Sequence, residues 1–121
     1  MRTVTHWIGG KPATGESTRT GPVWNPATGV QQAEVLLGSA ADVDTAVQAA
    51  DAAFASWSQS SLSARTKILF NFRELVNARV QELAEIVCDE HGKVMSDARG
   101  EVQRGLEVIE FACGIPSLLK G

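Results

Sequence analysis

Arg104 is the side chain in this sequence whose setting points most clearly to chemistry. It lies in a predicted helix over residues 93–113, in which successive residues turn by about 100°. One apolar stripe along this helix consists of Met95, Ala98, Val102, Leu106, Ile109 and Cys113. The opposite side carries Gly100, Arg104, Val108 and Phe111. An amphipathic helix normally presents only solvated residues there, so this helix is predicted to pack on two sides.

Two glycines inside the same helix, Gly100 and Gly105, support this interpretation. A glycine in mid-helix costs about 1 kcal/mol relative to alanine. We therefore expect another backbone segment to approach the helix closely at these positions.

An arginine on a second, partly covered face needs an anion. Its guanidinium stays protonated and offers a planar fork that matches a carboxylate at two points. Two partners fit this requirement. One is an intramolecular carboxylate, such as Glu101 or Glu107. The other is the carboxylate of a ligand, which would make Arg104 a substrate-binding residue.

The remaining candidates for chemistry are weaker. His6 and His91 lack companions at metal-ligand spacing, so we interpret them as surface or capping residues. Cys88 and Cys113 lie on apolar sides of their helices, where cysteine behaves as a small hydrophobe. A nucleophilic cysteine needs an activating base or a positive environment. We therefore assign no catalytic, metal-binding or cofactor-binding residue from spacing alone, and the sequence also lacks a glycine-rich phosphate loop.

The elements that must position these residues fall into two stretches. Residues 1–38 are predicted to form a β-rich arm, with a tight turn at Gly9-Gly10 and short strands separated by turn residues. Residues 39–121 are predicted to be helical. The fold class expected for the chain as it stands is α+β, a small β arm with two or three long helices.

Helical spacing predicts three long helices in the second stretch. The first covers about 40–57 and begins at Ser39-Ala40-Ala41-Asp42, which has capping-box spacing. It is predicted to be an amphipathic core helix. The second covers about 62–90 and ends near Gly92, at the position of a C′ glycine. The third covers about 93–113, and a short helical turn follows at Pro116.

Composition excludes several functional classes. The 121 residues carry a formal net charge of −3, so no basic surplus supports nucleic-acid binding. The apolar runs are far shorter than the roughly 20 residues that span a bilayer, and the first residues lack the apolar core of a secretory signal. Two cysteines form no disulfide framework. We expect a cytoplasmic protein with no membrane partner.

The chain resembles the N-terminal part of an aldehyde dehydrogenase over essentially all its residues. Features typical of the whole superfamily are Trp7-Ile8-Gly9-Gly10-Lys11, Asn25-Pro26-Ala27-Thr28-Gly29 and the alanine-rich stretch 46–57. More specific are Ile68-Leu69-Phe70-Asn71-Phe72, Glu90-His91-Gly92-Lys93 and residues 100–114, Gly-Glu-Val-Gln-Arg-Gly-Leu-Glu-Val-Ile-Glu-Phe-Ala-Cys-Gly. These resemble the CoA-acylating branch, the methylmalonate-semialdehyde (malonate-semialdehyde) dehydrogenases.

The resemblance implies a reaction. A cysteine attacks the semialdehyde, hydride passes to NAD, and a thioester forms. The β-carboxylate leaves as carbon dioxide and CoA takes the acyl group, giving propionyl-CoA or acetyl-CoA. An arginine in the Glu-Val-x-Arg-Gly motif holds the substrate carboxylate, and Arg104 occupies that position. The resemblance also implies an α/β fold with a dinucleotide-binding domain, assembled as a homo-oligomer, either dimer or tetramer.

The family runs to about four times this length, over several domains. Its catalytic cysteine, general base and NAD site belong to later sequence, so residues 39–121 match only the start of the dinucleotide-binding domain. We expect a fragment that is inactive by itself. Two alternatives remain open: another aldehyde dehydrogenase that uses water instead of CoA, and a non-catalytic, truncated helical assembly module.

Overall fold

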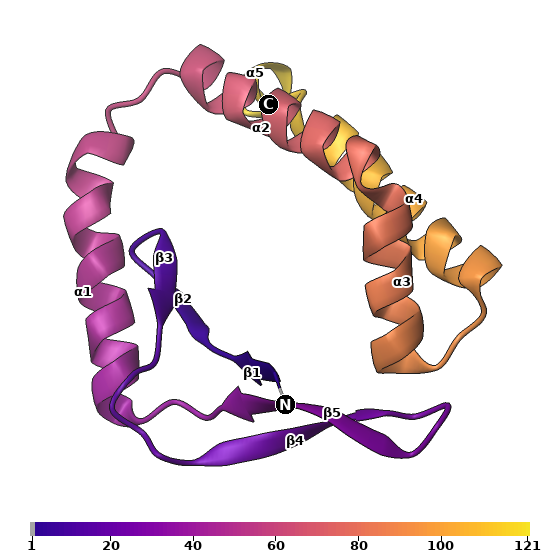
Figure 1. Ribbon diagram of the computed structural model, residues 1–121. Helices are drawn as coiled ribbons and strands as arrows, with labels where there is room; N and C mark the ends of the chain where they lie inside the picture. The colour runs from indigo at the N-terminus through magenta and orange to yellow at the C-terminus, as the bar shows by residue number, and fades with distance from the viewer. Residues whose placement is uncertain (1) are drawn as a thin grey trace. The chain divides into compact units, whose positions relative to one another are not determined.

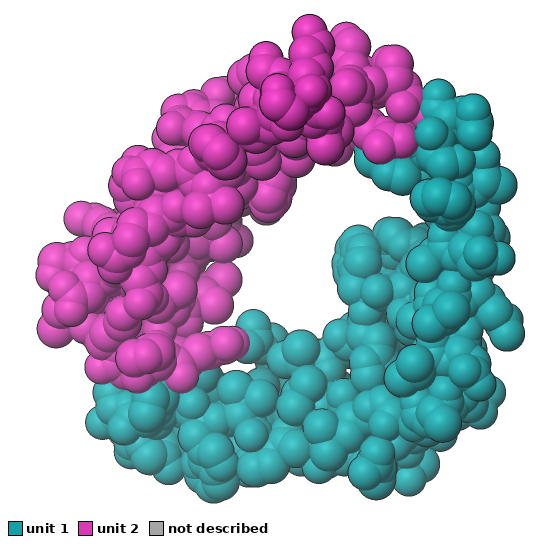
Figure 2. Space-filling view, turned by 180° about the vertical axis from the view of Figure 1, so that it is seen from behind, with its two compact units in different colours: residues 1–59 teal, residues 60–121 magenta. Residues whose placement is uncertain are grey.

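The computed structural model describes residues 2–121 and divides them into two compact units. The first unit extends to Gln59 and the second begins at Ser60 (Figure 2). The change from strands to helices comes at about residue 39, as expected, but the first helix groups with the strands and not with the later helices. The mixture of small sheets and long helices confirms the predicted α+β class.

The larger sheet of the first unit has three strands, β1 (Arg2–Val4), β4 (Thr20–Asn25) and β5 (Val30–Leu36). Their order is β1-β5-β4, with β1 parallel and β4 antiparallel to the central β5 (Figure 1). Ala33, at the middle of β5, is fully buried.

A two-stranded hairpin precedes β4. Strands β2 (His6–Ile8) and β3 (Lys11–Ala13) pair antiparallel. Gly9 and Gly10 connect them with φ of 61° and 78°. Two consecutive positive φ values are what a type I′ turn requires, and side-chain-free residues adopt them without strain. The predicted Gly9-Gly10 turn is confirmed.

Helix α1 (Ala40–Trp57) begins at the predicted capping box. The Ser39 side chain accepts a hydrogen bond from Asp42 N, and the Asp42 carboxylate accepts one from Ser39 N. The helix has the predicted bounds. The prediction that its apolar face is buried in a core is wrong, however, because Val43, Val47 and Phe54 are about three-fifths exposed. Short strands offer α1 little surface, and among the described residues the strand it contacts most is β2.

Asp42 also holds the loop after β3 against the start of α1. Its carboxylate accepts a hydrogen bond from Glu16 N at 2.7 Å, in addition to those from Ser39. Gly15 lies so close that a Cβ there would be 2.6 Å from Asp42 Oδ1, and its φ is +73°. The hydrogen bonds from Ser39 N and Glu16 N lower the pKa of Asp42 to about 2. One buried carboxylate therefore joins a helix start to a loop 26 residues earlier.

The single helix predicted over 62–90 is wrong, because the structure breaks it at Arg79. Helix α2 covers Leu62–Ala78 and α3 covers Val80–His91. Arg79 has φ −118° and ψ 19°, and its N–H bonds to Val76 O in a tighter turn than an α-helix. The break lets α2 and α3 each pack on the next long helix. Apolar spacing cannot reveal it, since the inward residues keep three- and four-residue steps across the break.

The third predicted helix is confirmed as α4 (Met95–Ala112), followed by α5 (Ile115–Leu118) with Pro116 in its first turn. Gly92 ends α3 in the left-handed conformation, φ 79°, as predicted. Leu106 of α4 is 2% exposed and lies in the small core with Ala84, Ala98 and Cys113. In residues 2–121 no helix has the length and apolar character needed to cross a membrane.

The depressed pKa of Asp42 gives a pH-dependent prediction. A carboxyl group whose pKa is lower when folded stabilises the fold fully above its ordinary pKa of 3.8. That contribution disappears as the pH falls toward about 2. Asp42→Asn should therefore lower the urea midpoint most above pH 3.8, and the difference from wild type should shrink with acidification. Asp44→Asn, at an exposed position of the same helix, is the control and should change little. A pH-independent difference would contradict the assignment.

Candidate functional site

Helix α4 has two opposite faces, as the sequence predicts. Ala98, Leu106 and Cys113 are buried on one face, where α2 and α3 pack. The opposite face carries Gly100, Arg104, Val108 and Phe111, and we call these four residues the outer face of α4. Val108 is 67% exposed and Phe111 70%. No described residue covers this apolar pair.

The expected close approach to the helix glycines is not found within residues 2–121. A Cβ built on Gly100 or Gly105 meets no heavy atom within 4 Å. Gly100 lies on the side of α4 opposite Ala98, away from the helices that pack on it. Gly105 lies nearly in line with Ala98, and the space beside it is open all the same. The space beside both glycines is open.

The first carboxylate that could neutralise Arg104 is already engaged. Glu101 lies one turn earlier on α4, and Lys93 Nζ donates a hydrogen bond to its Oε1. That hydrogen bond lowers the pKa of Glu101, and the charges of Lys93, His91 and Arg104 act in the same direction. Lys93 comes from the short connection between α3 and α4. Residue spacing does not predict this pair, because Lys93 lies in the connection between two helices and Glu101 lies inside the second.

The other two nearby carboxylates on α4 also have partners. Gln103 donates a hydrogen bond of 3.4 Å to Glu107. Arg73 of α2 donates to Glu110 Oε1 through Nε at 2.9 Å and Nη2 at 2.7 Å. The hydrogen bond to Glu110 raises the pKa of Arg73. This ion pair connects α2 to α4 across 37 residues of sequence.

Arg104 is consequently left without an anion. Its side chain is exposed and forms no hydrogen bond or ion pair with any described residue. The intramolecular ion pair, one of the two alternatives raised by the sequence, is thus not formed among residues 2–121. A free guanidinium with apolar neighbours on its own helix face can bind an external carboxylate at two points. That role remains a prediction for Arg104.

The other candidate residues are not brought together into a second site. His6 is in the first unit, on β2, whereas His91 ends α3 in the second. Cys88 is half-buried and Cys113 buried, and both are free thiols. Within the part of the chain that the structure describes, no three His, Cys, Asp or Glu side chains are placed to hold a metal ion.

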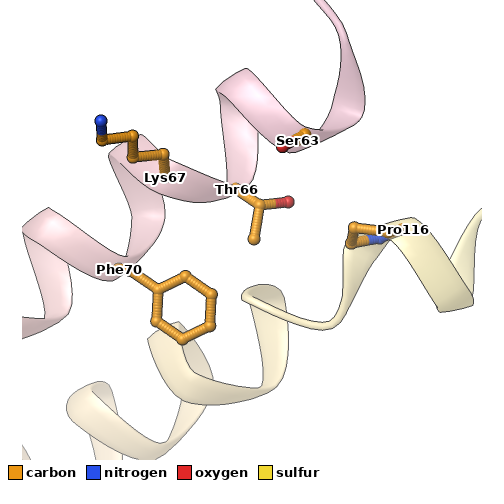
Figure 3. Close-up of a pocket in the computed structure, with 5 residues that line it drawn as sticks. All are labelled: Ser63, Thr66, Lys67, Phe70 and Pro116. Atoms are coloured by element: carbon orange, nitrogen blue, oxygen red, sulfur yellow. The ribbon is translucent and has the colours of Figure 1, made fainter.

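A hollow of about 390 Å³ lies between α2 and α5. Its lining residues are Ser63, Thr66, Lys67, Phe70 and Pro116. Figure 3 shows the Phe70 ring and the Thr66 side chain directed into the space between the two helices. The Thr66 hydroxyl donates to Leu62 O of its own helix. None of the candidate residues discussed above lines this hollow, and we assign it no chemistry.

Comparison with known proteins places this geometry in context. The model of the aldehyde dehydrogenase family matches residues 13–121. Malonate-semialdehyde dehydrogenase from Bacillus pumilus is 45% identical over 121 residues, covering 100% of this chain and 25% of that protein. The crystal structure of methylmalonate-semialdehyde dehydrogenase from Oceanimonas doudoroffii superimposes with a TM-score of 0.95 at 41% identity. The match covers 100% of this chain and 25% of the Oceanimonas doudoroffii chain.

A further solved structure extends the comparison to a cofactor complex. Aldehyde dehydrogenase C from Pseudomonas syringae, in complex with NAD⁺ and octanal, has a TM-score of 0.85 and 40% identity. The match covers 88% of this chain and 22% of that one. This chain thus spans about a quarter of the length of the relatives it matches. Over that quarter it has their fold, and the chain belongs to the aldehyde dehydrogenase family.

Proposed function

We propose that this chain supplies the carboxylate-recognising part of an NAD-dependent, CoA-acylating dehydrogenase for malonate or methylmalonate semialdehyde. The observation that carries the proposal is the unpaired guanidinium of Arg104, beside three carboxylates that already have partners. The names of the relatives from Bacillus pumilus and Oceanimonas doudoroffii support the substrate class. The products would be acetyl-CoA or propionyl-CoA and carbon dioxide.

In this proposal Arg104 acts by binding and orienting. Two parallel N–H donors of its guanidinium hold the substrate carboxylate in one plane, which fixes the direction of the aldehyde at the other end. The ion pair between the Arg104 guanidinium and the substrate carboxylate would be the same in the bound substrate and in the transition state. Arg104 therefore contributes mainly to substrate affinity, and its loss is expected to appear in KM.

NAD accepts the hydride in such a reaction when it is bound. Residues 2–121 contain no glycine-rich loop leading into a helix, the arrangement that cradles a dinucleotide. We therefore assign no NAD-binding residue here and derive no step through NAD. We likewise propose that the catalytic cysteine and the CoA-binding residues belong to other parts of the enzyme. The 121 residues alone are therefore proposed to be inactive. We further propose a cytoplasmic homo-oligomer, dimer or tetramer, for the whole enzyme.

One alternative is an aldehyde dehydrogenase that releases an acid by using water in place of CoA. Its substrate could be an acidic or a neutral aldehyde, and the Pseudomonas syringae relative is seen with a neutral one, because octanal carries no carboxylate. A requirement for CoA during turnover separates the two reactions. The other alternative is a non-catalytic assembly module, which the exposed apolar residues of α1 and α4 favour.

The first test uses a hybrid enzyme, in which this chain replaces the matching quarter of the Bacillus pumilus dehydrogenase. Arg104→Ala should raise the KM for malonate semialdehyde by about 30-fold or more, as expected for losing one partner of a charge pair. The KM for NAD should stay the same. Arg99→Ala is the matched control, because Arg99 is an exposed arginine of α4 that bonds to Gln81. Unchanged semialdehyde kinetics in Arg104→Ala would remove Arg104 from the site.

The second test concerns Lys93, which we propose as a positioning residue. Lys93→Met frees Glu101 to pair with Arg104 one turn away, and this should raise the semialdehyde KM of the hybrid by about two- to fivefold. Adding Glu101→Gln removes the competing carboxylate and should restore the KM. A double variant that keeps the raised KM would show that Lys93 acts by another route.

A further inference from the structure

Gly100 is the residue of the outer face of α4 whose type the described chain does not explain. Glycine destabilises the interior of a helix relative to alanine, so it is favourable there only where something requires the missing side chain. Gly100 has a helical backbone that alanine adopts equally well, and a Cβ there would meet no heavy atom within 4 Å. Neither its conformation nor a neighbour among residues 2–121 therefore requires a glycine.

The open space at Gly100 adjoins Arg104. The two residues are four positions apart on one face of α4, about 6 Å along the helix axis. Side chains of a helix lean toward its N-terminus, so the Arg104 side chain extends over the turn that contains Gly100. Gly105 differs, because it lies about 140° from Gly100 around the axis and its open space is on another side. Of the two glycines, only Gly100 thus leaves room beside a group that Arg104 binds.

Asp97 bounds this space on the side away from Arg104. It lies on the same face of α4, and its exposed carboxylate forms no ion pair with Arg104. Like charges repel, so a bound carboxylate is favoured at the Arg104 end of this surface and disfavoured at the Asp97 end. An uncharged group of the ligand, and not a second carboxylate, is therefore the group that suits the space over Gly100.

The two substrates proposed for the enzyme differ by one uncharged group of suitable size. Methylmalonate semialdehyde has a methyl group that malonate semialdehyde lacks, and this methyl is bonded to the carbon atom that carries the carboxylate. A guanidinium that holds both carboxylate oxygens thus brings the methyl group close to itself. A substrate methyl group beside Arg104 and a Cβ at position 100 would therefore compete for the same volume.

We propose that Gly100 is a specificity-determining residue, whose missing side chain admits a methyl group on the carbon next to the substrate carboxylate. The inference rests on the proposed function, because Arg104 must hold that carboxylate. With glycine at this position the enzyme accepts the methyl-branched semialdehyde as well as the unbranched one. With a larger residue it discriminates against the methyl-branched semialdehyde.

The kinetics of the hybrid enzyme with the two semialdehydes test this role. Gly100→Ala should lower kcat/KM for methylmalonate semialdehyde about tenfold or more relative to that for malonate semialdehyde, the discrimination expected of one methyl group in a pocket. Gly105→Ala is the matched control, since it also adds a Cβ to an open helical glycine of α4, and it should leave the ratio unchanged. Both variants should slightly raise the thermal midpoint of the 121-residue chain, because alanine favours the helix.

Packing of a protein segment against Gly100 is the rival explanation, and stability separates the two. A segment in that space would make Gly100→Ala lower the thermal midpoint of the hybrid, or prevent its folding, and reduce both activities alike. Either result would overturn the role of Gly100. An unchanged ratio of the two kcat/KM values would do the same, and a raised KM in Arg104→Ala would then leave the proposed function standing. If the wild-type hybrid does not fold, the two parts are co-expressed and the same ratio is measured.

Discussion

Helix α4 has apolar side chains on two opposite sides, and α2 and α3 cover one of them. The covered side contains Leu106, the largest fully buried side chain among the described residues, together with Ala98 and Cys113. The arrangement of α2 and α3 follows from this helix, because the break at Arg79 allows both segments to pack on it. The availability of Arg104 follows from it too, since the packing leaves the guanidinium on the uncovered side.

The distribution of charge around α4 is as important as its packing. Each nearby carboxylate of the helix has a partner of its own, and two of these partners are cations from outside the helix, Lys93 and Arg73. These pairs are partly exposed, and such pairs contribute little to stability. Their consequence here is one of specificity, because the Arg104 guanidinium contacts no carboxylate of the described residues and is available for an external one. The proposed recognition of a semialdehyde acid depends on this pairing of the helix carboxylates with residues other than Arg104.

The first unit is organised by a different interaction. Asp42 joins the start of α1 to the loop around Glu16, where Gly15 has a positive φ and lies so close that a Cβ would press on the Asp42 carboxylate. Much of the apolar surface of α1 remains exposed, as it does on α4. Both units therefore present surfaces typical of elements that belong to a larger structure, in agreement with relatives about four times as long.

Local patterns in the sequence were sufficient for most element boundaries. Capping-box spacing located the start of α1, paired glycines located the hairpin turn, and Gly92 located the end of α3, because each depends on residues within one turn of each other. Helical spacing also revealed the two faces of α4 and the position of Arg104. The break at Arg79 was not predictable in this way, since the apolar period continues through it.

The sequence by itself thus determined which residues lie on each face of α4 and that Arg104 needs an anion. The tertiary structure alone decided that none of the candidate carboxylates of the chain supplies it. Pairs such as Lys93 with Glu101 and Arg73 with Glu110 join residues 8 and 37 positions apart. Such contacts depend on how helices pack, and the spacing of residues along one helix carries no information about them.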